Sequence, residues 1–156
     1  MMAGIDTKGI KMQYINKWSI QLVKESSYKV ESKSITCPDD VIRIIAPHFD
    51  GKPKEEFIVL LLNTKNNVIG INTVSVGTVD TSIVHPREVF QPALLANATS
   101  IILAHNHPSG NTEPSDEDLK VTNRLIMAGN ILGIDVLDHV IYGDGVGLSL
   151  KVIGKM

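Results

Sequence analysis

The chain has 156 residues, a length typical of a single domain. Hydrophobic residues make up 43% and charged residues 21% of the sequence, which excludes general disorder. The formal net charge of −2 and the small number of aromatic residues argue against a basic or base-stacking surface for nucleic acid. A single cysteine, Cys37, excludes an intramolecular disulfide framework and a zinc site built from thiolates.

The sequence also predicts no membrane segment. Its longest apolar runs, Phe57–Leu62 and Ile101–Ala104, are far shorter than the roughly 18 residues that a membrane span needs. The first residues lack the apolar core of a secretory signal. Together with the lone cysteine, these features predict a cytoplasmic protein.

Residues 1–37 are expected to form a partly flexible N-terminal extension, and residues 38–156 the main domain. Residues 14–35 drift between apolar and charged side chains, with stretches of alternation. This pattern predicts one or two exposed strands, which we expect to be available for pairing in a homodimer.

The main domain is expected to open with a helix. Pro38 suits the first helical position, and Asp39 and Asp40 suit the positive end of the helix dipole. Pro47 is expected to end this helix.

The rest of the chain alternates short apolar runs with helical segments, without a regular repeat of strand, helix and strand. The predicted strands are Phe57–Leu62, Val68–Val76, Thr99–Ala104, about Asp135–Tyr142 and Val146–Val152. The predicted helices run from about His85 to Asn97 and from Ser115 to about Gly129 or Asn130. Pro92 is expected to break or kink the first of these helices. The first two strands form a hairpin. This mixture predicts an α+β fold, with a mixed sheet flanked by helices.

The chemistry is concentrated between residues 104 and 118. His105 and His107 are two apart on a predicted strand, so both imidazoles point to the same face. Asp118 lies in the first turn of the next helix, facing back toward the end of that strand. Two imidazoles and one carboxylate suit a divalent metal, most often zinc, and three protein ligands leave one position for water. The plainer alternative is a pair of surface histidines and a solvated acid.

Two further residues, Ser115 and His139, each have two possible roles. Ser115 caps the helix in the simpler reading, and donates a hydrogen bond to a developing oxyanion in the other. His139 lies in an apolar strand and is expected to be a hydrogen-bonded structural histidine, with a role beside the metal ligands as the alternative. Asn106, between the two histidines, should point away from the metal.

The spacing of these residues resembles a known family. A His-x-His-Pro segment, a serine seven positions after the proline and an aspartate three positions after the serine form the metal motif of the JAMM (MPN-type) metalloproteases. The segments HPREVFQPAL, IILAHNHPSG and LGIDVLDHVIYGDG are similar to the bacterial RadC-like branch, and the similarity spans Pro38 to Val152. The resemblance implies a curved mixed sheet like that of cytidine deaminases.

By the same resemblance, His105, His107 and Asp118 are zinc ligands and Ser115 lies on the oxyanion side. The family also needs a glutamate as general base at the start of an apolar strand, where this chain has Glu55 and Glu56. Neighbouring strand residues point to opposite faces, so only one of them can reach the metal site. Counting back from the end of the strand selects Glu55, and Glu56 remains an alternative.

The resemblance therefore implies a zinc-dependent hydrolase of peptide or isopeptide bonds, which uses water activated by the metal and a glutamate base. Its substrate is expected to be a peptide or protein that the sequence does not identify. Two other functions are a DNA-repair-associated accessory protein and a non-catalytic scaffold. Residues 1–37 lack the helix-hairpin-helix pattern of longer RadC-like proteins, and scaffolds usually lose the metal ligands that this chain retains.

Overall fold

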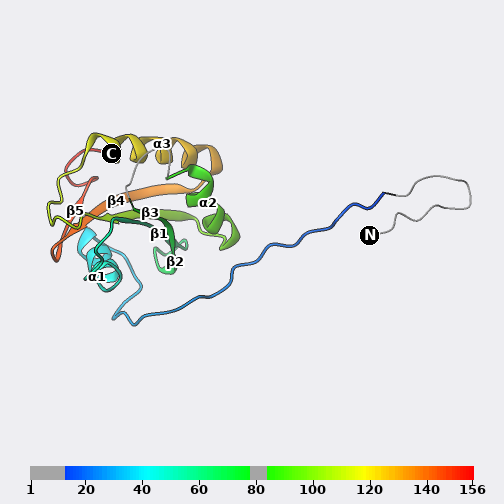
Figure 1. Cartoon of the computed structure of the whole chain (residues 1–156), viewed down its shortest axis with the longest axis horizontal. Coiled ribbons are helices and arrows are strands. Elements are labelled where there is room, and N and C mark those ends of the chain that lie inside the picture. Colours follow the sequence, from blue (N-terminus) through cyan, green and yellow to red (C-terminus); the bar gives the residue numbers. More distant parts are fainter. Residues whose placement is uncertain (1–12, 78–83) are drawn as a thin grey trace, which may run out of the picture.

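The computed structural model describes residues 13–77 and 84–156 (Figure 1). In chain order its elements are α1 (Pro38–Phe49), β1 (Glu56–Leu62), β2 (Val68–Val76), α2 (Pro86–Leu95), β3 (Ser100–Asn106), α3 (Asp116–Leu132), β4 (Asp135–Gly143) and β5 (Val146–Ser149). Within these residues, the strands form one five-stranded sheet in the order β2-β1-β3-β4-β5. None of the helices described here is long and apolar enough to cross a membrane.

The sheet is mixed, as expected for the α+β class. β1 pairs antiparallel with both β2 and β3, and β4 pairs antiparallel with β5. β3 and β4 run parallel, and α3 makes the crossover between them. Parallel neighbours need such a crossover, and it brings the first turn of α3 back to the end of β3.

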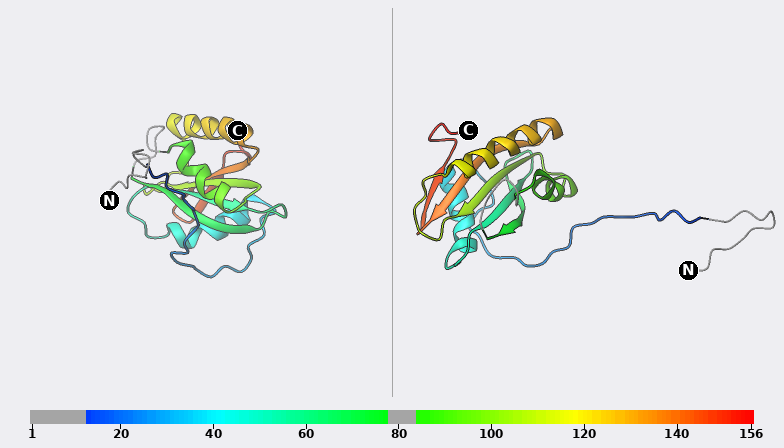
Figure 2. Two further views of the ribbon diagram at one scale, coloured as in Figure 1. Left: turned by 90° about the vertical axis from the view of Figure 1, so that its right-hand side faces the viewer. Right: turned by 45° about the horizontal axis from the view of Figure 1, so that its top comes forward.

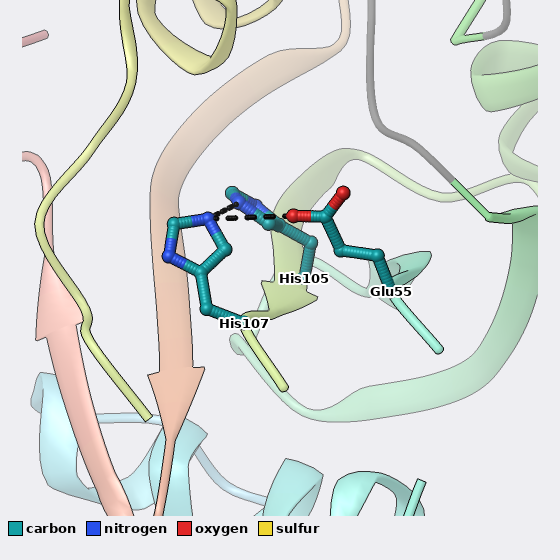
Figure 3. A group of neighbouring side chains, drawn as sticks. All are labelled: Glu55, His105 and His107. Carbon is teal, nitrogen blue, oxygen red and sulfur yellow. Dashed lines mark hydrogen bonds and ion pairs between the residues drawn. The ribbon is translucent and has the colours of Figure 1, made fainter. Parts of the chain in front are cut away.

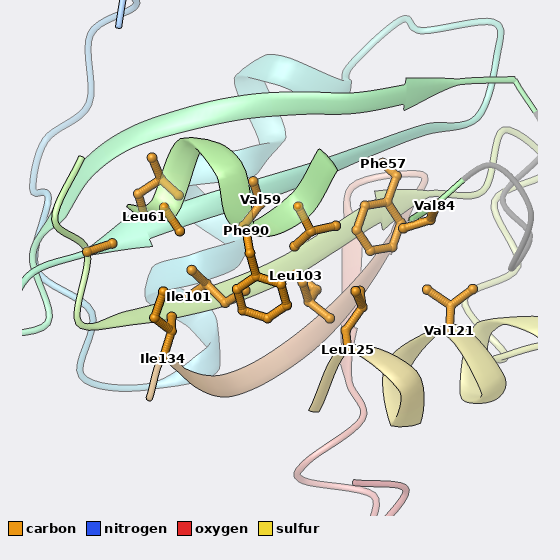
Figure 4. Close-up of a cluster of buried hydrophobic side chains, with 13 residues drawn as sticks. Phe57, Val59, Leu61, Val84, Phe90, Ile101, Leu103, Val121, Leu125 and Ile134 are labelled. Carbon is orange, nitrogen blue, oxygen red and sulfur yellow. The ribbon is translucent and has the colours of Figure 1, made fainter. Parts of the chain in front are cut away.

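Helices cover both faces of the sheet (Figure 2). Alternate residues of β1 divide between two cores because successive strand side chains point to opposite faces. Phe57, Val59 and Leu61 pack with residues of α2 and α3 (Figure 4), while Ile58 and Leu60 pack with residues of α1. Every residue of β1 and β3 is buried, which explains why both strands are continuous apolar runs in the sequence.

Most of the predicted elements are confirmed, with differences at their ends. α1 continues through Pro47 to Phe49, because a proline in the last turn removes only one helical hydrogen bond. α2 likewise continues through Pro92 to its end. α3 extends to Leu132, where Gly133 adopts the left-handed conformation that ends many helices. β5 ends at Ser149 because the following residues form a turn, in which the N–H of Ile153 donates to the carbonyl of Ser149.

The prediction of strands within residues 14–35 is wrong. The structure has only an isolated antiparallel bridge there, between Ser34 and Asn67, and residues 13–29 are all exposed. Alternating side chains favour a strand only where a neighbouring strand offers hydrogen bonds, and here the chain runs away from the sheet (Figure 1). The prediction for residues 1–12 lies outside the described residues.

One contact between the layers should be visible in a pH titration. The Tyr142 hydroxyl, near the end of β4, donates to Oδ1 of Asp50, the C-cap of α1, at 2.5 Å. Burial and this hydrogen bond raise the pKa of Tyr142 to about 12. The folded state therefore keeps a proton that the unfolded chain loses near pH 10. This stabilisation is complete below pH 10 and is lost as the pH rises toward 12.

We expect absorbance titration of the three tyrosines to show one that ionises only near pH 12. Tyr142→Phe should remove this late phase, whereas Tyr14→Phe, at an exposed position, should leave it in place. Burial also raises the pKa of Tyr28, so only a phase near pH 12 that survives in Tyr142→Phe would contradict the assignment.

Candidate metal centre

The end of β3 brings two histidines together. His105 is fully buried on the face that α3 covers, and His107 follows one residue after the strand. The His107 N–H donates to the carbonyl of Tyr142 at 2.8 Å, which keeps the chain extended beside β4. The two side chains thus point the same way, and their Nε2 atoms lie 3.0 Å apart (Figure 3).

The first turn of α3 adds a carboxylate to this pair. The Ser115 N–H donates to Oδ2 of Asp118 at 2.8 Å, and the Asp118 N–H donates to Oγ of Ser115 at 3.1 Å. This reciprocal capping fixes the start of the helix. It also holds the buried Asp118 with Oδ1 3.1 Å from Nε2 of His105 and Oδ2 3.4 Å from Nε2 of His107.

A second carboxylate approaches from the residue before β1. Oε1 of Glu55 lies 3.5 Å from Nε2 of His107, and one ligand atom from each of Glu55, His105 and His107 lies within 4.8 Å of the other two (Figure 3). Glu56 faces the α1 side of the sheet, where it bonds Nε2 of His48 at 2.9 Å and Nζ of Lys52 at 3.1 Å. The structure therefore brings Glu55, and not Glu56, to the histidines.

Asn106, which points to the opposite face of the sheet, fixes the backbone next to Glu55. Its side chain points away from the two histidines, as the strand alternation predicts. Its Oδ1 accepts from the N–H of Glu56 at 2.7 Å, and its Nδ2 donates to the carbonyl of Lys54 at 3.1 Å. One buried amide thus binds the backbone on both sides of Glu55 and aligns the start of β1 with the end of β3.

The hydrogen on His107 can be assigned from its partners. Nδ1 of His107 lies 2.6 Å from the carbonyl oxygen of Asn111, which can only accept. Nδ1 therefore carries a hydrogen, and in the neutral ring Nε2 presents its lone pair to the site.

The hydrogen on His105 is set by a buried chain of three groups. The Thr122 hydroxyl donates to the carbonyl of Asp118 at 2.6 Å, so it accepts from Nδ1 of His139, also at 2.6 Å. Burial, and then the neighbouring His105, hold the pKa of His139 well below its ordinary value, so the ring is neutral. Nε2 of His139 then accepts from Nδ1 of His105 at 2.8 Å, and the lone pair of His105 Nε2 faces inward.

These assignments leave several acceptors facing one another. The Nε2 atoms of His105 and His107 lie 3.0 Å apart, and each lies 3.1–3.4 Å from one oxygen of Asp118. Only a cation or a proton between these acceptors relieves their repulsion. The pKa of His107 shifts in the direction that this repulsion predicts. The hydrogen bond to Asp118 raises the pKa of His107, although burial opposes it. Burial alone would raise the pKa of the Asp118 carboxyl, but its close contacts with His105 and His107 hold that pKa well below its usual range.

The dimensions of this cluster fit a zinc ion. Nitrogen and oxygen ligands at about 2.0–2.1 Å from a tetrahedral zinc lie about 3.3 Å apart. The two Nε2 atoms lie 3.0 Å apart, and the Asp118 oxygens lie 3.1 Å from Nε2 of His105 and 3.4 Å from Nε2 of His107. Imidazole and carboxylate are also ligands that zinc accepts readily.

The cluster is sealed on one side and open on the other. The His105 and Asp118 side chains are buried, whereas those of His107 and Glu55 are 15% and 25% exposed. A separate cavity of about 490 Å³, lined by residues 49–52, 106–110 and 142–145, borders His107 but not Glu55, His105 or Asp118. Here the loop after His107 packs tightly on the turn after β4, since a Cβ at Gly143 would lie 2.7 Å from the carbonyl oxygen of Gly110.

Ser115 is placed by the structure at the N-cap of α3. Its Oγ accepts from the Asp118 N–H, and a hydroxyl that accepts keeps its own O–H as a donor. The helix-capping reading is thus observed, while the oxyanion role stays a prediction.

Sequence reasoning missed the backbone contacts that Asn106 makes and the part that Thr122 takes in this site. The sequence indicates these two residues only through their spacing from the proposed metal ligands. Asn106 alternates with the two histidines, and Thr122 lies one helical turn after Asp118.

Comparison with known proteins identifies the family of this chain. The RadC-like JAB domain is the family whose pattern matches residues 35–154, which places the protein in the JAB/MPN class of domains. Within that class, the chain belongs to the RadC-like JAB family.

Three relatives illustrate the match. The chain is 57% identical over 124 residues to a UPF0758 protein of Caldanaerobacter subterraneus, which covers 80% of this chain and 53% of that protein. It is 56% identical over 122 residues to a UPF0758 protein of Rubrobacter xylanophilus, covering 78% and 53% of the two chains. It is 47% identical over 127 residues to one from the archaeon Methanosarcina acetivorans, covering 81% and 56%. The chain thus spans about half the length of these relatives.

Replacing Asn106 should test the contact that aligns β1 with β3. Asn106→Ala leaves the N–H of Glu56 and the carbonyl of Lys54 without their side-chain partner, so we expect the free energy of unfolding to fall by about 2 kcal/mol in urea denaturation. Asn123→Ala, at an exposed position of α3, should stay within about 0.5 kcal/mol of the natural chain. Equal stabilities of the two variants would contradict the role of Asn106.

Proposed function

We propose that the protein is a zinc-dependent hydrolase of amide bonds in a peptide or protein substrate. The observation that carries this proposal is the convergence of the two Nε2 lone pairs of His105 and His107 with the carboxylates of Asp118 and Glu55. Membership of the RadC-like JAB family is compatible with hydrolase activity, while the names of the relatives state no activity.

His105, His107 and Asp118 would hold the ion. Asp118 is the acid that contacts both histidines, and it is buried with His105, as suits a permanent ligand. When bound, zinc supplies a Lewis acid that polarises a carbonyl and makes water more acidic. Three protein ligands leave a position for solvent, and in this cluster the exposed side is the one that Glu55 and His107 form.

Glu55 is suited to move the proton. Its carboxylate is partly exposed beside His107, so it can take a proton from attacking water and return it to the leaving amine. The Ser115 O–H would donate to the oxygen that becomes negative as the carbonyl is attacked. Asn106 positions Glu55 through the backbone, and His139 with Thr122 positions His105.

The two other functions receive less support. A non-catalytic scaffold has no need for a complete donor set with both histidine hydrogens directed outward. A DNA-repair accessory role would require a surface that attracts phosphate, and the chain carries a net charge of −2.

Metal analysis tests the first step of the proposal. Protein loaded with zinc and then dialysed should retain about one equivalent per chain, and His107→Ala should lose it because only two of the three ligands remain. His85→Asn removes a histidine that caps α2 outside the cluster and should retain the zinc. Retention of zinc by a folded His107→Ala variant would contradict the assignment.

Substitution of the two neighbouring glutamates tests the base. Glu55→Gln should lower cleavage by zinc-loaded protein in a broad peptide-library assay by about 10²–10⁴-fold, because an amide cannot accept the proton. Glu56→Gln, on the opposite face of the sheet, should leave most of the activity. If the loss is larger in Glu56→Gln, the roles of the two acids are reversed from this proposal.

Thr122 tests the buried chain behind His105. Thr122→Val has nearly the same shape but no acceptor for Nδ1 of His139, so the hydrogen on His105 is no longer fixed. We expect zinc affinity, measured by competition with a chelator, to fall about 10–100-fold. Thr122→Ser keeps the hydroxyl and should bind zinc nearly as the natural chain does. Equal affinities for the valine and serine variants would show that the hydroxyl is not needed.

A further inference from the structure

The outer edge of β2 is a long open strand edge. The strand order makes β2 and β5 the outer strands of the described sheet, and β2 has nine residues where β5 has four. The backbone groups on the outer side of an edge strand are free to pair with another strand. Ile69, on β2, is also 46% exposed.

The N-terminal arm, defined here as residues 13–29, is the counterpart of this edge. All of its residues are exposed, and it runs away from the domain (Figure 1). Trp18 is 81% exposed, and Trp18, Ile20 and Leu22 alternate with polar Ser19 and Gln21. Such an alternation puts one apolar row on an extended strand, and it is unfavourable to leave that row in water.

The chain already starts to pair with β2 before the arm departs. Ser34 forms an antiparallel bridge with Asn67, and the N–H of Val68 donates to the carbonyl of Lys33 at 2.8 Å. The Tyr28 hydroxyl then donates to the carbonyl of Ile44 at 3.0 Å, and Val30 packs on the core beneath α1. These contacts lead the chain across to α1, where Tyr28 holds the last residues of the arm, so residues 13–27 leave the domain away from the remaining edge of its own β2.

We propose that the arm of one copy of this chain pairs as an extra strand with the free edge of β2, residues 69–76, in a second copy. If the two copies are related by a two-fold axis, each arm pairs with the β2 edge of the other copy through the same contacts. Most homodimers have this symmetry. The backbone supplies the hydrogen bonds, and the row from Trp18 to Leu22 supplies the apolar contact. β5 is too short to take the same segment. This inference is independent of the proposed function.

Trp18 is the only tryptophan in the chain, so its fluorescence reports on the arm directly. We expect light scattering to show a shift from monomer to dimer as the protein concentration rises. The Trp18 emission should move to shorter wavelength over the same concentration range, because the ring becomes buried.

Two variants and one control test the pairing. Ser19→Pro in the arm and Ile69→Lys on β2 should each raise the dimerisation midpoint at least tenfold, since proline and an edge lysine both oppose strand addition. Ser19 makes no part of the folded core, so this variant cannot fail by unfolding the domain. Ile131→Lys, at an 87% exposed position of α3, should leave the midpoint unchanged.

Three results would overturn the proposal. The first is a chain that stays monomeric with Trp18 exposed at all concentrations up to millimolar. The second is burial of Trp18 in the monomer, which would mean that the arm docks on its own chain. The third is a dimer whose midpoint neither Ser19→Pro nor Ile69→Lys changes, which would place the interface elsewhere.

Discussion

The candidate metal centre depends on where two hydrogens are held. The carbonyl of Asn111 takes the hydrogen of His107, and the chain from His139 through Thr122 to the carbonyl of Asp118 takes the hydrogen of His105. Each hydrogen lies on the outer nitrogen of its ring, so both inner nitrogens are acceptors. The centre is therefore prepared for a cation by groups that do not touch it.

The alternation of one strand builds both sides of the site. Successive residues of β3 point to opposite faces of the sheet, so His105 faces α3 while Asn106 faces the α1 side. The first face brings in the carboxylate of Asp118, and the second anchors the backbone around Glu55. A shift of one residue in the pairing of β1 with β3 would exchange these faces and separate Glu55 from the histidines.

Much of this could be predicted from the sequence, because the main signals are local. The apolar runs of β1 and β3, the turn between β1 and β2, and the cap at Ser115 all follow from neighbouring residues. The convergence of His105 and His107 follows from strand geometry in the same way. The arm is different, since its alternation predicted strands that need a partner outside the local sequence. The partners of Asn106 and His139 are also distant in the chain, at separations of 50 and 34 residues.

The unequal burial of the side chains around the cluster determines the route by which an ion would bind and be released. His105 and Asp118 are enclosed by the sheet and α3, whereas His107 is carried by a short loop that is held at Gly110 and Gly143. Exchange would then begin with a local opening of this loop, which costs less than unfolding of the domain. The rate of ion release and the global stability of the protein would be governed by different parts of the molecule.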